Sequence, residues 1–217
     1  MTRLAAEAVG WAVAGRFVLV DVDLALAAGS LTALTGENGA GKSSLLALLA
    51  GSRKPARGVV KLDDVPLADI DAAHLARRLA RLDHTPGLYL ELSALENLKL
   101  FHGLLHPSRP EPAIAALLER VGLARRDHDR PVRGFSRGML QRTALARVLA
   151  SGADVWLLDE PSTGLDRAGS ALLADVLDDA RRQGAAILLA THDPALLPLA
   201  DRQLHLAHGH VVATEAA

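Results

Sequence analysis

The chain has 217 residues, half of them hydrophobic, and a formal net charge of −1. This is enough apolar sequence for one large core or two small ones, while the near-neutral charge excludes a global basic field that would attract nucleic acid. The chain contains no cysteine, which excludes disulfides and thiolate metal sites and agrees with a reducing compartment.

The first fifteen residues carry two short apolar stretches that Glu7 interrupts. No clear cleavage site follows them, so we expect no signal peptide. No apolar run approaches the roughly 18 residues that a membrane helix needs. We therefore expect a soluble chain that acts at a membrane only through a partner.

The first third of the chain alternates strand and helix patterns. Residues 17–26 alternate in polarity, which favours β-structure, and residues 30–35 are typical of a short buried strand. A helix is expected over 44–51, where Gly51 ends it. Residues 57–67 indicate two further short strands.

The middle of the chain, from about Thr85 to Arg133, changes character and indicates an inserted helical lobe. A helix is expected over 91–105. Ser93 and Glu96 stand three residues apart near its start, which is the spacing of a capping box.

A second lobe helix is expected over 111–122 after a loop at 106–110. Pro112 suits its first turn and Gly122 ends it. Its apolar face consists of Ile114, Leu117, Leu118 and Val121.

The last third of the chain returns to alternating elements. A helix continues to Gly152, residues 155–160 form a strand pattern, and a helix follows over 169–182. A strand within 185–193 and a hairpin over 202–212 complete the chain. Strands that alternate with helices indicate an α/β fold with a mainly parallel central sheet.

The sequence GENGAGKS, residues 36–43, matches the phosphate-loop pattern G-x-x-x-x-G-K-[ST] between a strand and a helix. Its glycines let backbone N–H groups point at phosphate oxygens, and the helix that follows adds the positive end of its dipole. Lys42 is expected to reach the β- and γ-phosphates, and the Ser43 hydroxyl to bind Mg²⁺. A plain glycine turn is the alternative. The expected ATP-binding residues of this loop are Gly36, Glu37, Asn38, Gly39, Ala40, Gly41, Lys42, Ser43 and Ser44.

Two acids, Asp159 and Glu160, follow a strand that has no other polar residue. Ligands of open α/β sheets bind at the carboxyl ends of strands, so Asp159 is interpreted as a Mg²⁺ ligand. Glu160 faces the other way and is a candidate to orient or deprotonate a water. The alternative is two acids that begin a surface loop. Trp156, on the same strand, is interpreted as core.

His192 ends a second buried strand and is the exception among nine histidines, which are otherwise interpreted as solvated or core residues. A parallel strand would deliver His192 to the phosphates. There it could hydrogen-bond the γ-phosphate and hold the water and Glu160 in register.

Four motifs, taken together, resemble those of the ATP-binding cassette ATPases, the nucleotide-binding subunits of ABC transporters. The motifs are Gly36–Ser44, Phe135–Arg142, Leu157–Asp166 and Thr191–Asp193. The resemblance covers essentially the whole chain. It implies an α/β P-loop ATPase core over 1–84 and 134–217, with N-terminal antiparallel strands, a mainly parallel sheet and a helical lobe over about 85–133.

The segment FSRGM stands where this family carries its signature, usually LSGGQ. In the family two subunits pack head to tail, and each signature caps the ATP bound by the other subunit. The resemblance therefore implies that Ser136, Arg137, Gly138 and Met139 contact the partner's nucleotide, although Arg137 and Met139 depart from the usual pattern. It also implies that Asp166 lies at the dimer interface, and that ATP and Mg²⁺ are bound. An ordinary helix cap is the alternative for FSRGM.

Two positions differ from the family pattern. The Gln that usually joins core and lobe is His84 here, which is a poorer Mg²⁺ ligand than a carbonyl oxygen. The aromatic residue that usually stacks on adenine aligns with Val13, with Trp11 two residues away and on the same face. Either Trp11 stacks on adenine, or adenine packs on an aliphatic surface.

The chain holds one cassette and no permease, which implies a homodimer, or a pair with a related ATPase, bound to separate membrane subunits at the cytoplasmic face of the cell membrane. It looks most like small ATPases of the haem-exporter type used in cytochrome c maturation, and it resembles other small drug- or polysaccharide-export ATPases. A cassette ATPase acting on DNA or ribosomes would be expected to have a coiled-coil insertion or a second cassette. A simple P-loop kinase would not account for FSRGM, for His192 or for PSTGLD, residues 161–166.

Overall fold

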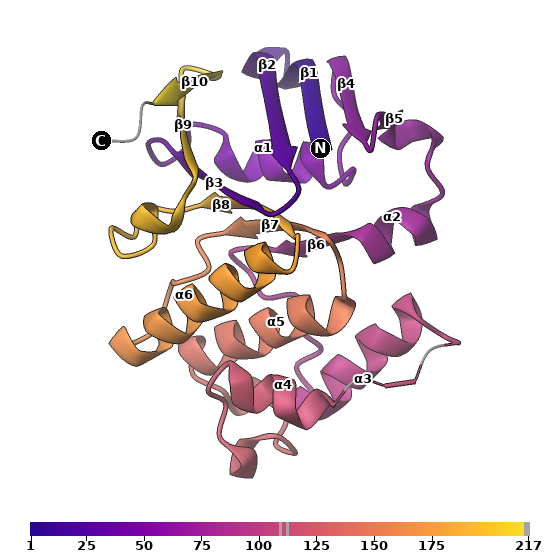
Figure 1. Ribbon diagram of the computed structural model, residues 1–217, viewed down its shortest axis with the longest axis vertical. Helices are drawn as coiled ribbons and strands as arrows, with labels where there is room; N and C mark the ends of the chain where they lie inside the picture. The colour runs from indigo at the N-terminus through magenta and orange to yellow at the C-terminus, as the bar shows by residue number, and fades with distance from the viewer. Residues whose placement is uncertain (109, 112, 215–217) are drawn as a thin grey trace.

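The computed structural model describes residues 1–108, 110, 111 and 113–214 and builds them into two sheets and several helices (Figure 1). Arg109 and Pro112, which the sequence assigns to a loop and to the first turn of a helix, lie outside the described residues. No helix in the described part of the chain is long and apolar enough to cross a membrane.

The smaller sheet is antiparallel and has the strand order β2-β1-β4-β5. Its strands are β1 (Thr2–Val13), β2 (Arg16–Ala27), β4 (Arg57–Leu62) and β5 (Val65–Pro66). The strand β1 pairs with both β2 and β4, and it shifts register between Ala6 and Val9. Such irregularity breaks the regular alternation of side chains. The expected N-terminal antiparallel strands are confirmed.

The larger sheet has the order β10-β9-β3-β8-β7-β6, and all its pairs are parallel except β9–β10. Its strands are β3 (Ser30–Thr35), β6 (Leu79–Leu82), β7 (Val155–Asp159), β8 (Ala186–Ala190), β9 (Arg202–Ala207) and β10 (His210–Thr214). Every residue of β7 and β8 is buried. This explains their continuous apolar sequence, because a parallel sheet is covered on both faces.

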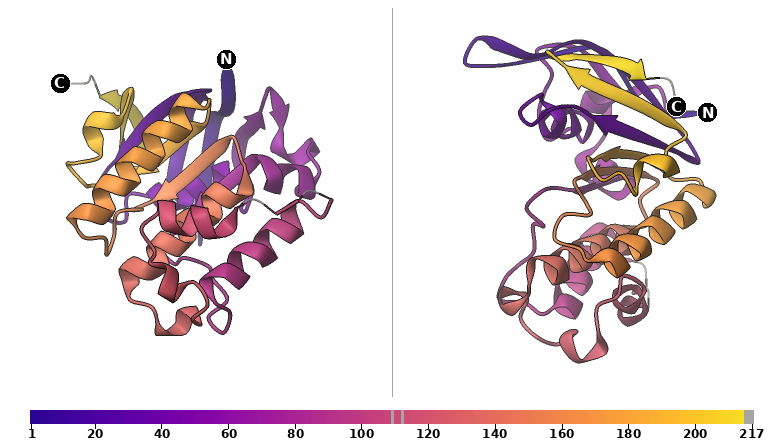
Figure 2. Two further views of the ribbon diagram at one scale, coloured as in Figure 1. Left: turned by 60° about the horizontal axis from the view of Figure 1, so that its bottom comes forward. Right: turned by 90° about the vertical axis from the view of Figure 1, so that its left-hand side faces the viewer.

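Helices cover both faces of the parallel sheet. Leucines of α1 (Lys42–Leu49) pack into one core with residues of both sheets. On the opposite face, α5 (Arg137–Ser151) and α6 (Arg167–Arg182) share a second core with α3 (Ala94–Leu105) and α4 (Ile114–Arg120). Figure 2 shows α3 and α4 at the end of the molecule opposite the antiparallel sheet. The architecture thus matches the expected mainly parallel core with added helices.

Local signals fix several helix ends. The Ser93 hydroxyl accepts from the Glu96 N–H at 3.1 Å, and the Glu96 carboxylate accepts from the Ser93 N–H at 2.8 Å, so the capping box is confirmed. Gly152 ends α5 with a φ of 63°, a left-handed conformation that glycine adopts without strain. Two elements were not predicted, α2 (Ala72–Arg78) and β6. Neither shows a regular spacing of apolar residues in the sequence. The helix α2 buries none of its residues, and β6 has only four residues.

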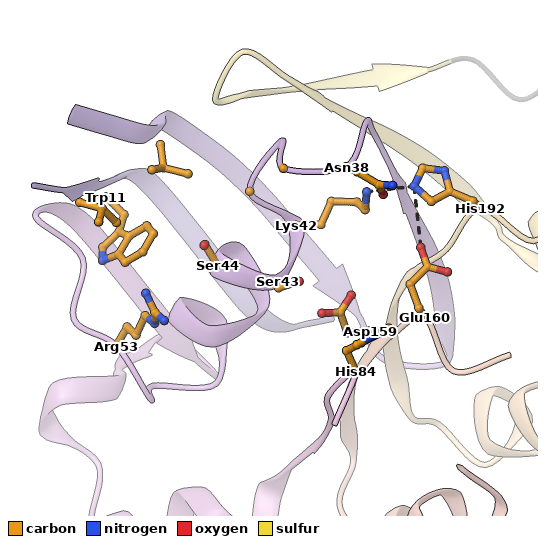
Figure 3. Close-up of a pocket in the computed structure, with 14 residues that line it drawn as sticks. Trp11, Asn38, Lys42, Ser43, Ser44, Arg53, His84, Asp159, Glu160 and His192 are labelled. Atoms are coloured by element: carbon orange, nitrogen blue, oxygen red, sulfur yellow. Dashed lines mark hydrogen bonds and ion pairs between the residues drawn. The ribbon is translucent and has the colours of Figure 1, made fainter. Parts of the chain in front are cut away.

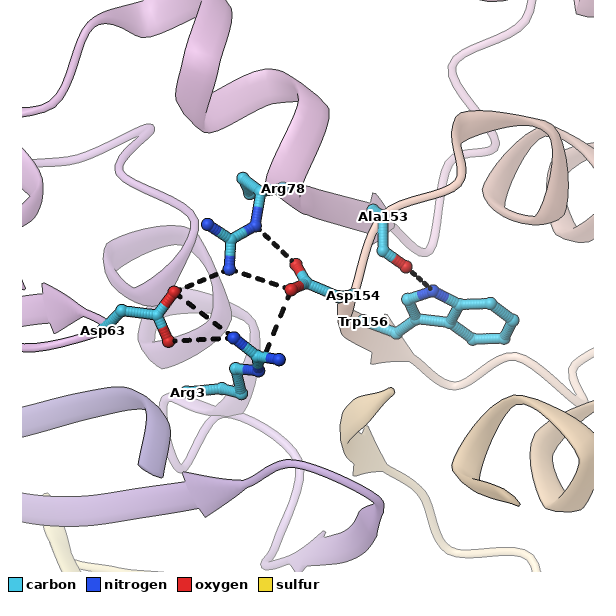
Figure 4. A network of polar contacts seen from close by, with 6 residues as sticks. All are labelled: Arg3, Asp63, Arg78, Ala153, Asp154 and Trp156. Carbon is cyan, nitrogen blue, oxygen red and sulfur yellow. Dashed lines mark hydrogen bonds and ion pairs between the residues drawn. The ribbon is translucent and has the colours of Figure 1, made fainter. Parts of the chain in front are cut away.

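Four charged side chains join the antiparallel sheet to the parallel sheet (Figure 4). Arg78 donates to both Asp154 oxygens at 2.9 and 2.8 Å and to Asp63 at 2.7 Å. Arg3 donates to Asp63 at 3.3 Å. Asp154 directly precedes β7, and Asp63 lies in the turn after β4. The network therefore ties the two inner strands of the antiparallel sheet, β1 and β4, to the start of β7 in the parallel sheet.

Trp156 lies beside this network and is a core residue, as expected. Its side chain is buried, and its indole N–H donates to the Ala153 carbonyl at 2.8 Å. The only polar atom of the indole is thus satisfied without a ligand.

The network lowers the pKa of Asp63. Burial alone would raise the pKa of this carboxyl, but hydrogen bonds from Arg78 and Arg3 outweigh burial and bring the pKa below its ordinary value. A carboxylate with a lowered folded-state pKa stabilises the fold above its unfolded-state pKa of about 4, and this contribution is lost as pH falls through the lowered value.

We predict that Arg78→Met lowers the free energy of unfolding by about 1–3 kcal/mol, because charge-assisted hydrogen bonds are lost and two carboxylates lose a partner. Urea unfolding of the variant and the wild type at pH 7 measures this difference. Arg182→Met is the matched control, since Arg182 pairs with Asp178 on the exposed face of α6 and such surface pairs contribute at most about 1 kcal/mol.

The difference in the free energy of unfolding between Arg78→Met and the wild type depends on pH. It is expected to be complete above pH 5 and to shrink as pH falls below about 4, because protonated Asp63 no longer benefits from Arg78. A difference that stays constant between pH 7 and pH 3 would contradict the assigned role of the Asp63 charge.

Candidate functional site

A pocket of about 700 Å³ lies beside the first turn of α1 and the carboxyl ends of β7 and β8 (Figure 3). Most of the residues that the sequence singles out for nucleotide, metal and water meet there, although they come from distant parts of the chain. The lining residues are Trp11, Val13, Val18, Asn38, Gly39, Gly41, Lys42, Ser43, Ser44, Arg53, His84, Asp159, Glu160 and His192.

The loop at 36–41 has a backbone shape that requires glycine at two points. Gly36 has a φ of 144°, and a Cβ there would lie 2.4 Å from the Leu206 carbonyl oxygen. Gly41 has a φ of 108° and forms the N-cap of α1. The loop is therefore a curled turn that leads directly into a helix N-terminus, where free N–H groups favour an anion.

The Lys42 side chain is buried and lies within this loop. Its ammonium donates to the Gly36 carbonyl at 2.5 Å and to the Glu37 carbonyl at 3.1 Å. Its third contact is the His192 Nε2 at 3.0 Å. Three donors thus meet three acceptors, which places a positive charge at the centre of the loop.

The contact with Lys42 identifies the tautomer of His192. An ammonium only donates, so Nε2 of His192 accepts and its proton lies on Nδ1. The same Nε2 lies 3.8 Å from the Glu160 carboxylate, which is beyond hydrogen-bond distance. The three side chains form a row from the loop to the end of β7, and a gap separates His192 from Glu160.

The two acids after β7 differ in their surroundings. Asp159 is the last residue of the strand and is 4 % exposed, whereas Glu160 is partly exposed. Glu160 has a φ of 49°, a left-handed conformation that costs a residue with a side chain about 1 kcal/mol or more. Its N–H donates to the Ala190 carbonyl at the end of β8 at 2.8 Å. The turn that follows β7 therefore directs the two carboxylates differently.

Oxygen donors suited to Mg²⁺ are present at the site. Ser43 and Asp159 line the same pocket, and a hydroxyl and a carboxylate are ligands that Mg²⁺ prefers, together with phosphate oxygens and water. His84 lines the pocket as well but offers a nitrogen, which Mg²⁺ binds poorly. The described residues contain no cluster of three or more His, Asp or Glu that could hold a metal alone. The set fits a metal that is shared with a bound phosphate.

The opposite end of the pocket is formed by Trp11, Val13 and Arg53. Trp11 and Val13 lie on one strand two residues apart and line the same pocket, as expected. The Arg53 guanidinium lies 4.5 Å from the centre of the Trp11 ring, a cation–π contact. Arg53 is a site residue that sequence reasoning missed. It follows α1 in a basic segment, and nothing in the local pattern relates it to Trp11.

The FSRGM segment does not line this pocket. Ser136 is the N-cap of α5 and accepts from the Met139 N–H at 3.3 Å. Gly138 packs so closely on the loop after β7 that a Cβ would lie 2.6 Å from the Gly164 carbonyl oxygen. Ser136, Gly138 and Met139 line a separate hollow. Arg137 alone approaches the main pocket, where its guanidinium lies 3.3 Å from the His84 ring.

Asp166 lies beside the same separate hollow and has a local role. It is the N-cap of α6, where its carboxylate accepts from the Gly169 N–H at 2.9 Å and from Arg142 at 2.8 Å. The backbone hydrogen bond from Gly169 and the nearby charge of Arg142 lower the pKa of Asp166, although burial acts in the opposite direction. The side chain remains 71 % exposed, so it is free to face a partner.

Three residues of the phosphate loop lie outside the main pocket. Glu37 and Ala40 line a neighbouring hollow of about 1010 Å³, which they share with the turn between β9 and β10. Gly36 lines neither hollow, and its carbonyl oxygen contacts Lys42.

Comparison with known proteins identifies the family. The model of the ABC transporter family matches residues 19–163. The cytochrome c biogenesis ATP-binding export protein CcmA of Paramagnetospirillum magneticum is 42 % identical over 194 residues, which is 88 % of each chain. The molybdenum import ATP-binding protein ModC of Mycobacterium tuberculosis is 39 % identical over 204 residues, which is 88 % of this chain and 55 % of that protein.

Solved structures agree with this result. The structure of an ATP-binding subunit of an ABC transporter superposes with a TM-score of 0.89 and 29 % identity, and the match covers 98 % of this chain and 89 % of that one. A dimeric bacterial ABC transporter cassette has the same fold, with a TM-score of 0.86 at 24 % identity and 96 % coverage of both chains. The chain therefore belongs to the ABC transporter family, as one of its ATP-hydrolysing cassettes.

Proposed function

We propose that this chain powers export through separate membrane subunits, and that its transporter serves cytochrome c maturation. It would do so as a single cassette with a core at 1–84 and 134–217 and a helical lobe at about 85–133. The observation that carries the mechanism is the row formed by Lys42, His192 and Glu160, which leads from the phosphate loop to the end of β7.

ATP would bind along the main pocket with its phosphates on the loop at 36–43. The Lys42 ammonium would exchange its contacts with the loop carbonyls for the β- and γ-phosphate oxygens. Trp11 would stack on adenine at the other end. The Arg53 guanidinium on the indole supports this arrangement, because it fixes the ring as part of a flat platform. Val13, which is 48 % exposed, would contribute an aliphatic edge.

Hydrolysis would depend on Glu160 and His192. When phosphate takes the Lys42 ammonium away, Nε2 of His192 is free to accept a hydrogen bond from the attacking water. It would donate to a γ-phosphate oxygen only in the form that carries a proton on Nε2. Glu160, 3.8 Å away, leaves space in which a water can be oriented and deprotonated. Ser43, Asp159 and phosphate oxygens would hold Mg²⁺, which would supply positive charge beside the β- and γ-phosphates. His84 would face the same region through water.

Two copies, or this chain and a related ATPase, would close on two ATP molecules. Ser136, Arg137, Gly138 and Met139 lie at the start of the 15-residue helix α5, and a helix N-terminus with a guanidinium beside it suits a γ-phosphate. Because Ser136, Gly138 and Met139 line a hollow separate from their own chain's pocket, a partner's nucleotide would be their ligand. Asp166 would face its counterpart across the interface. Loss of the γ-phosphate would then open the dimer.

The membrane subunits would dock on the helical lobe. Tyr89, Leu90, Leu100 and Leu104 lie on α3 and the segment before it, and these residues are 54, 54, 37 and 67 % exposed. Large apolar residues exposed along one helix and its entry segment would suit contact with a partner. The protein would therefore lie at the cytoplasmic face of the cell membrane.

The cargo is inferred from relatives alone. The relatives named CcmA support haem export or another step of cytochrome c biogenesis, whereas the relative named ModC is a molybdenum import ATP-binding protein. Other small drug- or polysaccharide-export systems are the alternative. Action on nucleic acid is not expected.

We predict that Lys42→Ala weakens ATP binding by about 10- to 100-fold, because charge-assisted hydrogen bonds to phosphate are lost. Titration with a fluorescent ATP analogue measures the affinity. Lys61→Ala is the control, since Lys61 pairs with Glu7 on the antiparallel sheet. Unchanged affinity in Lys42→Ala would contradict the phosphate-loop assignment.

We predict that Glu160→Gln keeps ATP affinity within about twofold but lowers turnover by about 100- to 10,000-fold, the range for loss of a general base. The variant should also accumulate as an ATP-bound dimer in size-exclusion chromatography. Glu119→Gln, on α4, serves as the control. Hydrolysis by Glu160→Gln at the wild-type rate would rule out this role.

We predict that the tagged protein, purified from gently solubilised membranes of its own host, brings down integral-membrane subunits identified by mass spectrometry. Haem-handling subunits would support the role in cytochrome c maturation. A permease of another kind would keep the ATPase mechanism and assign a different cargo. Leu104→Glu should abolish co-purification, whereas Val212→Glu, at an exposed position on β10, should not. Ribosomal or DNA-repair proteins without a permease would overturn the transport proposal.

A further inference from the structure

The segment at 83–92, between β6 and α3, carries His84 into the nucleotide pocket. Side chains from two helices hold its backbone. From α3, the fully buried Asn97 accepts from the Tyr89 N–H at 2.8 Å and donates to the Tyr89 carbonyl at 3.0 Å. From α5, Arg147 reaches the half of the segment nearer to His84. The position of His84 therefore depends on two helices that lie outside the pocket.

Arg147 joins three separate elements at one point. Its guanidinium donates to the Gly87 carbonyl at 2.9 Å and to the Arg81 carbonyl on β6 at 3.3 Å. It also lies 4.7 Å from the centre of the Phe101 ring on α3. Gly87 has a φ of 60°, and a Cβ there would lie 3.4 Å from the guanidinium. The loop thus turns closely around this side chain.

Arg147 is partly buried, and even partial burial carries a cost for a charged group. Burial lowers the pKa of Arg147, and the nearby charge of Asp83 opposes this effect only in part. The Asp83 carboxylate pairs with Arg81, and among the described residues Arg147 forms no ion pair with a carboxylate. An apolar side chain would pack between the helices without the cost of desolvation. What it would lack is a planar fork of donors able to hold two carbonyls in fixed directions.

We infer that Arg147 is a positioning residue for ATP hydrolysis, which fixes the His84 segment against α3 and so sets where His84 stands in the pocket. This inference rests on the proposed role of the pocket. Arg147 acts on His84 through the backbone at Gly87, and it contacts neither nucleotide nor water.

The same arrangement gives His84 two connections to the proposed partners. Phe101, which stacks on Arg147, lies on the helix that carries the exposed Leu100 and Leu104. Arg137 at the start of α5 contacts the His84 ring itself.

The test compares steady-state ATP turnover and ATP affinity in the full chain for Arg147→Met, Arg147→Lys and a control. Arg147→Met should lower kcat by up to about 100-fold, the cost of misplacing a group by about 1 Å, and leave ATP affinity within twofold. Arg147→Lys, which can hold only one carbonyl firmly, should fall between Met and wild type. Arg120→Met is the matched control, because Arg120 also joins the lobe to the core, through Asp179 at 2.6 Å, and should leave kcat unchanged.

The decisive measurement is a double-mutant cycle with His84→Ala. If Arg147 acts through His84, Arg147→Met has no further effect on kcat in the His84→Ala background. Equal loss of kcat in both backgrounds, or a wild-type kcat in Arg147→Met, would overturn the inference. If Glu160→Gln proves fully active, the proposed catalytic roles fail, yet the cycle still reports whether Arg147 and His84 are coupled.

Discussion

The complete burial of β7 and β8 is the constraint on which the rest of the structure depends. Two neighbouring parallel strands end at the same edge of the sheet. Asp159 at the end of β7, Glu160 directly after it and His192 two residues after β8 therefore come together there. The helix α1 begins at the same edge with its phosphate loop. Because these strands are buried on both faces, their residues must be apolar almost to the end of each strand. Polar side chains are tolerated only at the carboxyl ends, which is where ligands of such sheets bind.

Much of this arrangement could be predicted from the sequence, because its signals are local. The phosphate loop needs glycines at fixed spacing, the capping box needs Ser93 and Glu96, and a buried strand needs an unbroken apolar run. Each of these constraints is present within about ten residues. The position of the site also follows from these patterns, because neighbouring parallel strands end on the same side of the sheet.

The contacts that the sequence did not predict join residues far apart in the chain. Arg53 meets Trp11 at one end of the pocket, and Arg147 meets Gly87 in the segment between β6 and α3. An arginine on a helix has the same local pattern whether it faces water or a carbonyl of a distant loop. The strand β6 was missed for a related reason, because four residues become a strand only through pairing with β7.

The contacts of Lys42 also bear on which anions the site can retain. Its ammonium already donates to two carbonyls of its own loop and to His192. A phosphate oxygen that takes the place of one of these acceptors exchanges one hydrogen bond for another, so the net gain at Lys42 is smaller than for a free ammonium. A ligand that also pairs with the N–H groups of the loop and of the helix start would therefore be favoured over one that reaches Lys42 alone.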